Sequence, residues 1–205
     1  GYIAQRLLNE NEKENGLKAL HNKYVLNGEK DAFAFADLFD KMPFNEVDAL
    51  VLSQFSYLKW NGLVPKPSYT IEAISLADMK ETMDETVVFS DERYEKENRL
   101  LFSHLTESKR FAGMSCNYFA DIINEEVETQ FCAITCFFTD MVPVVVFRGT
   151  DENLVGWKED FNMAFNKPVP GQRLAALYLN EVGSKIDGKF IVCGHSKGGN
   201  LAVYS

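Results

Sequence analysis

The pattern of hydrophobic and polar positions along the chain changes near residue 110. Residues 1–41 are charge-rich without a sustained period, and from Asn45 to this point apolar side chains recur at helical spacing among charged residues. After it, runs of aromatic and β-branched side chains predominate. The first pattern is typical of amphipathic helices and the second of strands. The sequence therefore predicts a helical part followed by a part that contains a sheet.

The clearest helix is predicted from Asn45 onward, in the stretch NEVDALVLSQFSYLKW. Its apolar positions follow helical spacing, namely Val47, Leu50, Val51, Phe55 and Leu58. Asn45 belongs to the residue types that cap a helix N-terminus, and Asp48 stands at the N3 position, where a carboxylate is favourable. Breakers in NGLVPKP end this helix, and two more are predicted over residues 70–83 and 91–107.

Beyond residue 110, strands are predicted at roughly 116–123, 130–138 and 143–148. Helical patterns follow in DENLVGWKEDFNMAF and PGQRLAALYLNEVGSKI. The short apolar run 189–193 predicts a strand that is buried on both faces, and KGGNLAVYS begins another helix. Strands followed by alternating helix and strand predict an α/β fold with a partly parallel sheet.

We expect two regions along the chain. Residues 1–109 would form an N-terminal arm, over 1–41, and a helical region, and residues 110–205 the core of the fold. The helical region could act as a lid or cap over a site, or could simply add a layer to the fold. The sequence does not separate these two roles.

Composition and charge exclude several classes of protein. With 205 residues, 46% of them hydrophobic and 25% charged, the chain can bury a core and is unlike disordered proteins. Its net charge of −9, without a basic run, argues against nucleic acid as a partner. No stretch reaches the about 18 apolar residues that a transmembrane helix needs. Nothing in the sequence indicates an oligomeric state.

The four cysteines lie in apolar, strand-like segments and lack CxxC spacing, namely Cys116, Cys132, Cys136 and Cys193. We expect buried free thiols, and neither a metal nor an organic cofactor. The first residues, GYIAQRLLNENEKENG, lack the basic and apolar segments of a secretory signal. Both observations favour a cytoplasmic location, with peripheral association with a membrane left open.

The stretch FIVCGHSKGGNLAVYS contains the strongest chemical motif. Ser196 stands in a G-x-S-x-G pattern between a buried-type strand and the start of a helix. Gly194 and Gly198 occupy the positions where small residues let the two backbones approach, and Gly199 adds clearance. This context predicts a nucleophile elbow, with the backbone N–H of Lys197 directed at a developing negative charge.

A second stretch, FRGTDENLVGWKEDFNMAF, places Arg148, Gly149 and Thr150 at the end of a strand, where open α/β sheets bind ligands. Together with PFNEVDALVLSQFSYL and CGHSKGGNLAVYS, it resembles class 3 (fungal-type) lipases and, more closely, a bacterial branch of lipase-like α/β-hydrolases. The likeness covers roughly residues 43–205. It implies an α/β-hydrolase fold, incomplete at the C-terminus of this chain, with an N-terminal helical extension.

The resemblance also implies roles for individual residues. Thr150 would supply the first oxyanion donor through its backbone N–H and its hydroxyl, and the N–H of Lys197 the second. Arg148, Trp157 and Asp160 would be scaffold residues, and an Arg148–Asp160 pair would hold the loop that carries Thr150. The Lys197 side chain would either favour an anionic substrate or reach water.

The acid and the histidine of a catalytic triad are missing after Ser196. In these hydrolases they follow the serine, but none of the nine residues beyond Ser196 is Asp, Glu or His. We expect both partners beyond residue 205, and little or no turnover by the isolated 205-residue chain. His195 is expected to pack as a structural residue, and His21 and His104 to face solvent. None of the three is nominated as the base.

The sequence thus predicts a serine hydrolase of carboxylic esters, with a small-molecule or lipid ester as substrate and an acyl-enzyme on Ser196. Two alternatives remain open. The first is a catalytically inactive α/β-hydrolase-like protein that binds or scaffolds. The second is an acyltransferase or thioesterase that uses the same serine.

Overall fold

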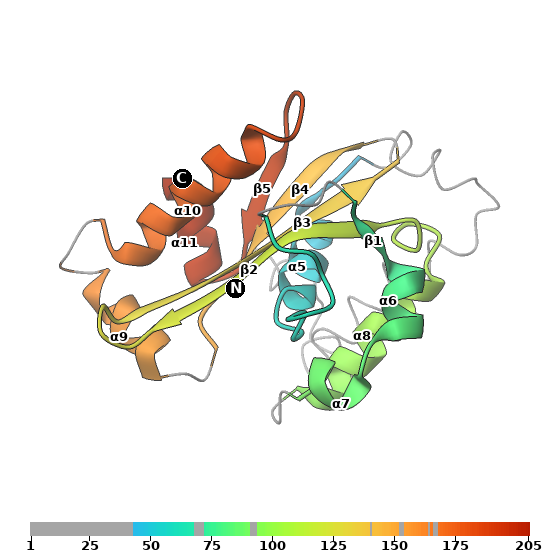
Figure 1. Ribbon diagram of the computed structural model, residues 1–205, viewed down its shortest axis with the longest axis horizontal. Coiled ribbons are helices and arrows are strands. Elements are labelled where there is room, and N and C mark those ends of the chain that lie inside the picture. The colour runs from blue at the N-terminus through green and yellow to red at the C-terminus, as the bar shows by residue number, and fades with distance from the viewer. Residues whose placement is uncertain are drawn as a thin grey trace, which may run out of the picture.

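The computed structural model describes residues 43–67, 72–90, 94–139, 141–151, 154–163, 165 and 168–205. The arm predicted over residues 1–41 lies outside these ranges. In the described part of the chain, a five-stranded sheet runs through the molecule with helices on both of its faces (Figure 1). This arrangement is a mixed α/β fold.

The sheet has the strand order β1-β2-β3-β4-β5. Its strands are β1 (Ile74–Ser75), β2 (Ser115–Asn124), β3 (Thr129–Phe138), β4 (Met141–Phe147) and β5 (Ile191–Gly194). The first four pair antiparallel and β5 pairs parallel to β4, which confirms the predicted partly parallel sheet. The expectation that β5 is buried on both faces is not met in the described part of the chain, where β5 is the last strand in the order and all four of its residues are half-buried.

The described helices form two groups (Figure 1). On one face of the sheet lie α5 (Glu46–Phe55), α6 (Leu76–Thr82), α7 (Glu85–Val88) and α8 (Glu95–Glu107), and on the other lie α10 (Pro170–Gly183) and α11 (Lys197–Tyr204). Helix α9 (Leu154–Asn162) packs against β3 beside the β2–β3 hairpin. The helix predicted over 70–83 begins only at Leu76, because residues 74–75 pair with β2 and the Ser75 side chain caps α6.

Strand β4 explains why both faces need helices. Four consecutive residues, from Val144 to Phe147, are fully buried. Because side chains alternate along a strand, Val144 and Val146 join the core beneath α5 and α8, whereas Val145 and Phe147 join the core beneath α10 and α11. A strand with two apolar faces is stable only between two covering layers.

An interior ion pair holds α5 in place. The predicted cap is confirmed: the Asn45 side chain accepts from the backbone of Val47 and Asp48, and the Asp48 carboxylate accepts from the Asn45 N–H. The same carboxylate receives two hydrogen bonds from Arg110, at 2.7 Å from Nε and 2.5 Å from Nη2. Both side chains are at most 2% exposed. The pair therefore ties α5 to the segment that leads into β2.

The described cysteines are all free: Cys116, Cys132 and Cys136 are buried and Cys193 is half-buried. Among the described residues, no helix combines the length and the apolar character that crossing a membrane requires.

Arg110→Met is expected to lower the free energy of unfolding by about 3–5 kcal/mol, because it removes a positive charge and two hydrogen bonds from the buried Asp48 carboxylate. Urea denaturation measures the loss. The matched control is Arg99→Met, which removes only the exposed pairs with Glu85 and Glu95 and should have a much smaller effect. Equal losses in the two variants would contradict the role given to the Asp48–Arg110 pair.

Candidate functional site

Ser196 occupies the sharp turn between β5, which ends at Gly194, and α11, which begins at Lys197. Its backbone has φ 57° and ψ −122°, a conformation that side-chain-bearing residues rarely adopt. The residue is exposed, and its side chain does not cap the helix. The strained turn thus presents the hydroxyl at the carboxyl end of two parallel strands.

Close backbone contacts hold this turn against the end of β4. A Cβ on Gly194 would lie 2.6 Å from the carbonyl oxygens of Gly198 and Phe147. A Cβ on Gly198 would overlap the Phe147 carbonyl and lie 3.0 Å from the carbonyl carbon of Arg148. At Gly199 the nearest atom would be 3.1 Å away, which a small shift can accommodate. Gly194 and Gly198 are therefore sterically required, and Gly199 is less constrained.

The segment after β4 passes directly beside the serine turn. Gly149 is buried between the Tyr57 hydroxyl and the His195 carbonyl, both within 3.0 Å of the place where a Cβ would stand. Thr150 follows and is half-buried. In the described part of the chain, neither the amide of Thr150 nor that of Lys197 donates to a backbone carbonyl. Among the described residues, two amides thus lack a backbone acceptor, one directly after Ser196 and one directly after Gly149.

Helix α9 holds Thr150. The Thr150 hydroxyl donates to Asp160 Oδ2 at 2.5 Å, so its single proton is already committed. Only the backbone N–H of Thr150 remains to serve an oxyanion, whereas the resemblance implied the hydroxyl as well. A Cβ on Gly156 would lie 2.8 Å from Thr150 Cγ2, so the helix backbone also packs on this side chain.

Arg148 is 1% exposed, but its partner differs from the expected one. Its Nη2 lies 2.7 Å from Asp121 Oδ1 on β2 and 3.8 Å from Asp151 Oδ2, so the expected Arg148–Asp160 pair does not form. The reason is the sheet: Arg148 N–H bonds to the Cys132 carbonyl, and Cys132 pairs with Asp121 on β2. Arg148 thus supports the segment after β4 from the sheet, and Asp160 supports it from α9.

The Lys197 side chain lies in neither of its two expected positions, which were beside a substrate or in water. It points neither to solvent nor to a substrate, because it is buried, with Nζ 2.7 Å from the Gln130 carbonyl and 2.9 Å from Glu159 Oε2. Glu159 is 0% exposed and accepts two further hydrogen bonds, from the backbone N–H of Gln130 and of Gly171. This network joins the first residue of α11 to β3, α9 and α10.

Sequence reasoning missed Glu159 and Tyr57. Glu159 lies in a charged stretch beside Asp160, and helical periodicity alone does not say which of the two faces the core. One signal was present: a lysine directly after an elbow serine, at a position that is often apolar, indicates an interior carboxylate to pair with it. Tyr57 lies about 140 residues from the serine motif, as the numbering shows, and only the packing of α5 on β4 and β5 brings it near.

Other residues near the elbow are poor candidates for its chemistry. His195 is exposed, not packed as expected, and partial burial of its ring lowers its pKa. Burial raises the pKa of the Cys193 thiol to about 12, so this neighbour stays protonated and unreactive at neutral pH. Trp157 is 61% exposed, which contradicts its expected role as a packed scaffold residue. Ser196 is therefore the candidate nucleophile at this turn.

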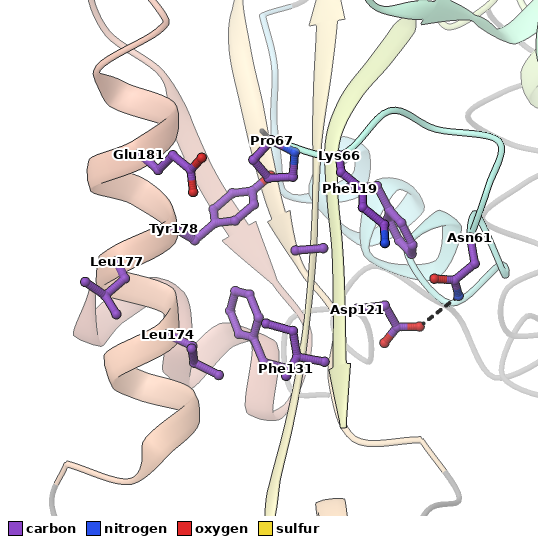
Figure 2. A pocket seen from close by; sticks show the side chains of 12 residues that line it. Asn61, Lys66, Pro67, Phe119, Asp121, Phe131, Leu174, Leu177, Tyr178 and Glu181 are labelled. Atoms are coloured by element: carbon purple, nitrogen blue, oxygen red, sulfur yellow. Dashed lines mark hydrogen bonds between the residues drawn. The ribbon is translucent and has the colours of Figure 1, made fainter. Parts of the chain in front are cut away.

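A separate pocket of about 350 Å³ lies between α10 and β2 (Figure 2). Leu174, Leu177 and Tyr178 from α10 form one wall, and Phe131 from β3 forms part of the floor. Neither Ser196 nor Thr150 lines it. Asp121 lines this pocket and accepts a hydrogen bond from Asn61 Nδ2 at 3.1 Å. The same carboxylate pairs with Arg148, so the pocket and the segment after β4 share this residue.

No group of three or more His, Cys, Asp or Glu side chains is placed to hold a metal within the described ranges. Residues 105–205 match the family model Mbeg1-like, which groups lipase-like α/β-hydrolase proteins. This part of the chain, called the Mbeg1-like domain after that model, is similar to the family. It contains the segment after β4 and the serine turn, but not α5. No curated protein and no solved structure gave a match.

Gly198→Ala is expected to lower the free energy of unfolding by about 3 kcal/mol or more, because the new methyl group overlaps backbone that cannot move freely. Gly199→Ala, one residue along the same helix, is the matched control and should fold with nearly unchanged stability. Thermal unfolding followed by circular dichroism distinguishes the two. A Gly198→Ala protein as stable as Gly199→Ala would contradict the close approach of β4 and α11.

Lys197→Met is expected to destabilise the protein by about 3–5 kcal/mol, because Glu159 stays buried without a cation. The double variant Lys197→Met/Glu159→Gln should be more stable than Lys197→Met alone, since no uncompensated charge remains. Urea unfolding of both single variants and the double variant measures the coupling. Strictly additive losses would show that the two side chains do not interact.

Proposed function

We propose that this Mbeg1-like domain carries the nucleophile of a serine hydrolase that cleaves carboxylic esters, with small-molecule or lipid esters as substrates. One observation carries the proposal: Ser196 is exposed in a strained turn, at φ 57°, between β5 and α11. Such strain is maintained where a reactive group must be presented. Gly194 and Gly198 leave the space that this turn needs, as the nucleophile-elbow motif requires.

In the proposed reaction, Ser196 Oγ forms a bond to the ester carbonyl carbon while its proton passes to a general base. The carbonyl oxygen becomes negatively charged. When the bond to the alcohol oxygen breaks, that oxygen leaves with the proton. Water then attacks the acyl-enzyme in the same way, releases the carboxylic acid and restores the Ser196 hydroxyl.

The backbone N–H groups of Thr150 and Lys197 are the proposed donors to the negative oxygen. Their support differs. Thr150 is held from α9 through Asp160, whereas Lys197 is held through its own side chain by Glu159. Because α9 carries both carboxylates, one helix fixes both donors relative to the nucleophile. Preorganised donors of this kind each contribute about 10²–10³ to kcat in serine hydrolases.

The proposal needs a general base and an acid that orients it. By the order serine, acid, histidine of the hydrolases that this chain resembles, we place both beyond Ser205. His195 does not serve, since neighbouring side chains on such a turn diverge. We also propose a cytoplasmic setting, in line with four free thiols.

A fluorophosphonate probe applied to the full-length protein tests the proposal. The probe is expected to label the wild-type protein, because it phosphonylates only an activated serine, and Ser196→Ala should abolish labelling. Mass spectrometry of the labelled peptide measures the site. Ser184→Ala, at an exposed serine after α10, is the matched control and should label normally.

Three results would contradict the proposal. Absence of labelling in the wild-type protein would favour the inactive binding protein, and labelling that survives Ser196→Ala would place the nucleophile elsewhere. Transfer of the acyl group to an added alcohol or amine in preference to water would identify an acyltransferase.

A further inference from the structure

Tyr57 lies outside the Mbeg1-like domain and contacts the segment after β4 at Gly149. It follows α5 in a short turn, in which its N–H bonds to the Gln54 carbonyl at 3.0 Å. The residues on either side, Ser56 and Leu58, are at most 1% exposed, so the turn is anchored in the core while the Tyr57 side chain is only half-buried. A side chain held in this way loses little entropy when it binds a ligand.

The hydroxyl of Tyr57 lies close to the backbone of the serine turn. Its oxygen and the His195 carbonyl oxygen both lie within 3.0 Å of one point, the Cβ position of Gly149, and therefore within about 6 Å of each other. His195 and Gly149 directly precede Ser196 and Thr150, respectively. The phenol thus lies next to the residues that directly precede the proposed nucleophile and the first proposed oxyanion donor.

The hydroxyl is suited to donate a hydrogen bond. Burial raises the pKa of Tyr57 above its ordinary value, even though Arg148 and the backbone N–H of Gly149 lower it, so the phenol stays protonated at neutral pH. A hydroxyl oxygen that accepts the Gly149 N–H keeps its own proton for another acceptor. The nearby Asp151 and Asp160 further disfavour the phenolate.

Building on the proposed function, we propose that the Tyr57 hydroxyl is a further catalytic residue, a third hydrogen-bond donor to the substrate's carbonyl oxygen beside the amides of Thr150 and Lys197. The donor comes from the helical region that precedes the Mbeg1-like domain. The Gly149 position makes this possible, because any side chain there would occupy the space of the hydroxyl. The oxyanion site is then built from three segments that are distant in the sequence.

Tyr57→Phe tests this role, because it removes one oxygen and keeps the ring. In the full-length protein, kcat on a soluble ester should fall about 10-fold or more while KM stays within about two-fold, the signature of a donor used in the transition state. The rate of fluorophosphonate labelling should fall in parallel. The melting temperature should drop by no more than about 4 °C, as expected for one lost hydrogen bond.

Tyr178→Phe is the matched control. The Tyr178 hydroxyl bonds to Thr135 at 2.9 Å and donates to the Tyr118 carbonyl at 2.7 Å inside the core, so its loss should lower stability without changing kcat. The inference is overturned if Tyr57→Phe keeps wild-type kcat and labelling rate, or if its loss of activity only follows a loss of stability like that of Tyr178→Phe.

Failure of this inference is distinguishable from failure of the proposed function. If Tyr57 has no part in catalysis, the wild-type protein and Tyr57→Phe label equally fast at Ser196. If Ser196 is not a nucleophile, the wild-type protein does not label there, and the role of Tyr57 falls with it.

Discussion

The contact between the Phe147 carbonyl and Gly198 is the constraint on which the rest of the site depends. It sets the end of β4 against the first turn of α11, closer than any residue with a Cβ would permit. This approach accompanies the strained backbone of Ser196 and the position of Gly149 beside the His195 carbonyl. The proposed chemistry thus depends on how closely two backbone segments can pack.

Buried ion pairs hold the helices and strands around this contact in position. Glu159 on α9 receives Lys197 from α11 and backbone donors from β3 and α10, while Asp48 and Arg110 fix α5 on the opposite face. Interior pairs of this kind contribute little net stability over apolar residues of similar shape, but breaking one is costly. Here the pairs fix the positions of helices, because each pair involves a helix that carries or faces a residue of the candidate site.

The sequence indicated the elements that depend on local pattern. The Asn45 cap, the strands around Cys132 and Val145 and the glycines around Ser196 are all set by neighbours in the chain, and the structure has them where the pattern places them. The sequence did not indicate the ion-pair partners that depend on tertiary packing. Arg148 meets Asp121 through sheet register, and Lys197 turns inward to a carboxylate that periodicity left ambiguous. β5, the last strand in the described order, is half-buried, and local pattern does not encode strand order.

The backbone of Ser196 also bears on how such a domain would evolve. A positive φ is tolerated far better by glycine than by serine, so exchanging this residue would relieve strain at a single step. A lineage released from selection for reactivity would drift toward glycine here, gaining stability as it lost the hydroxyl. Serine in this conformation is less stable than glycine would be, and under the proposed function the reactivity of its hydroxyl is the benefit that offsets this cost.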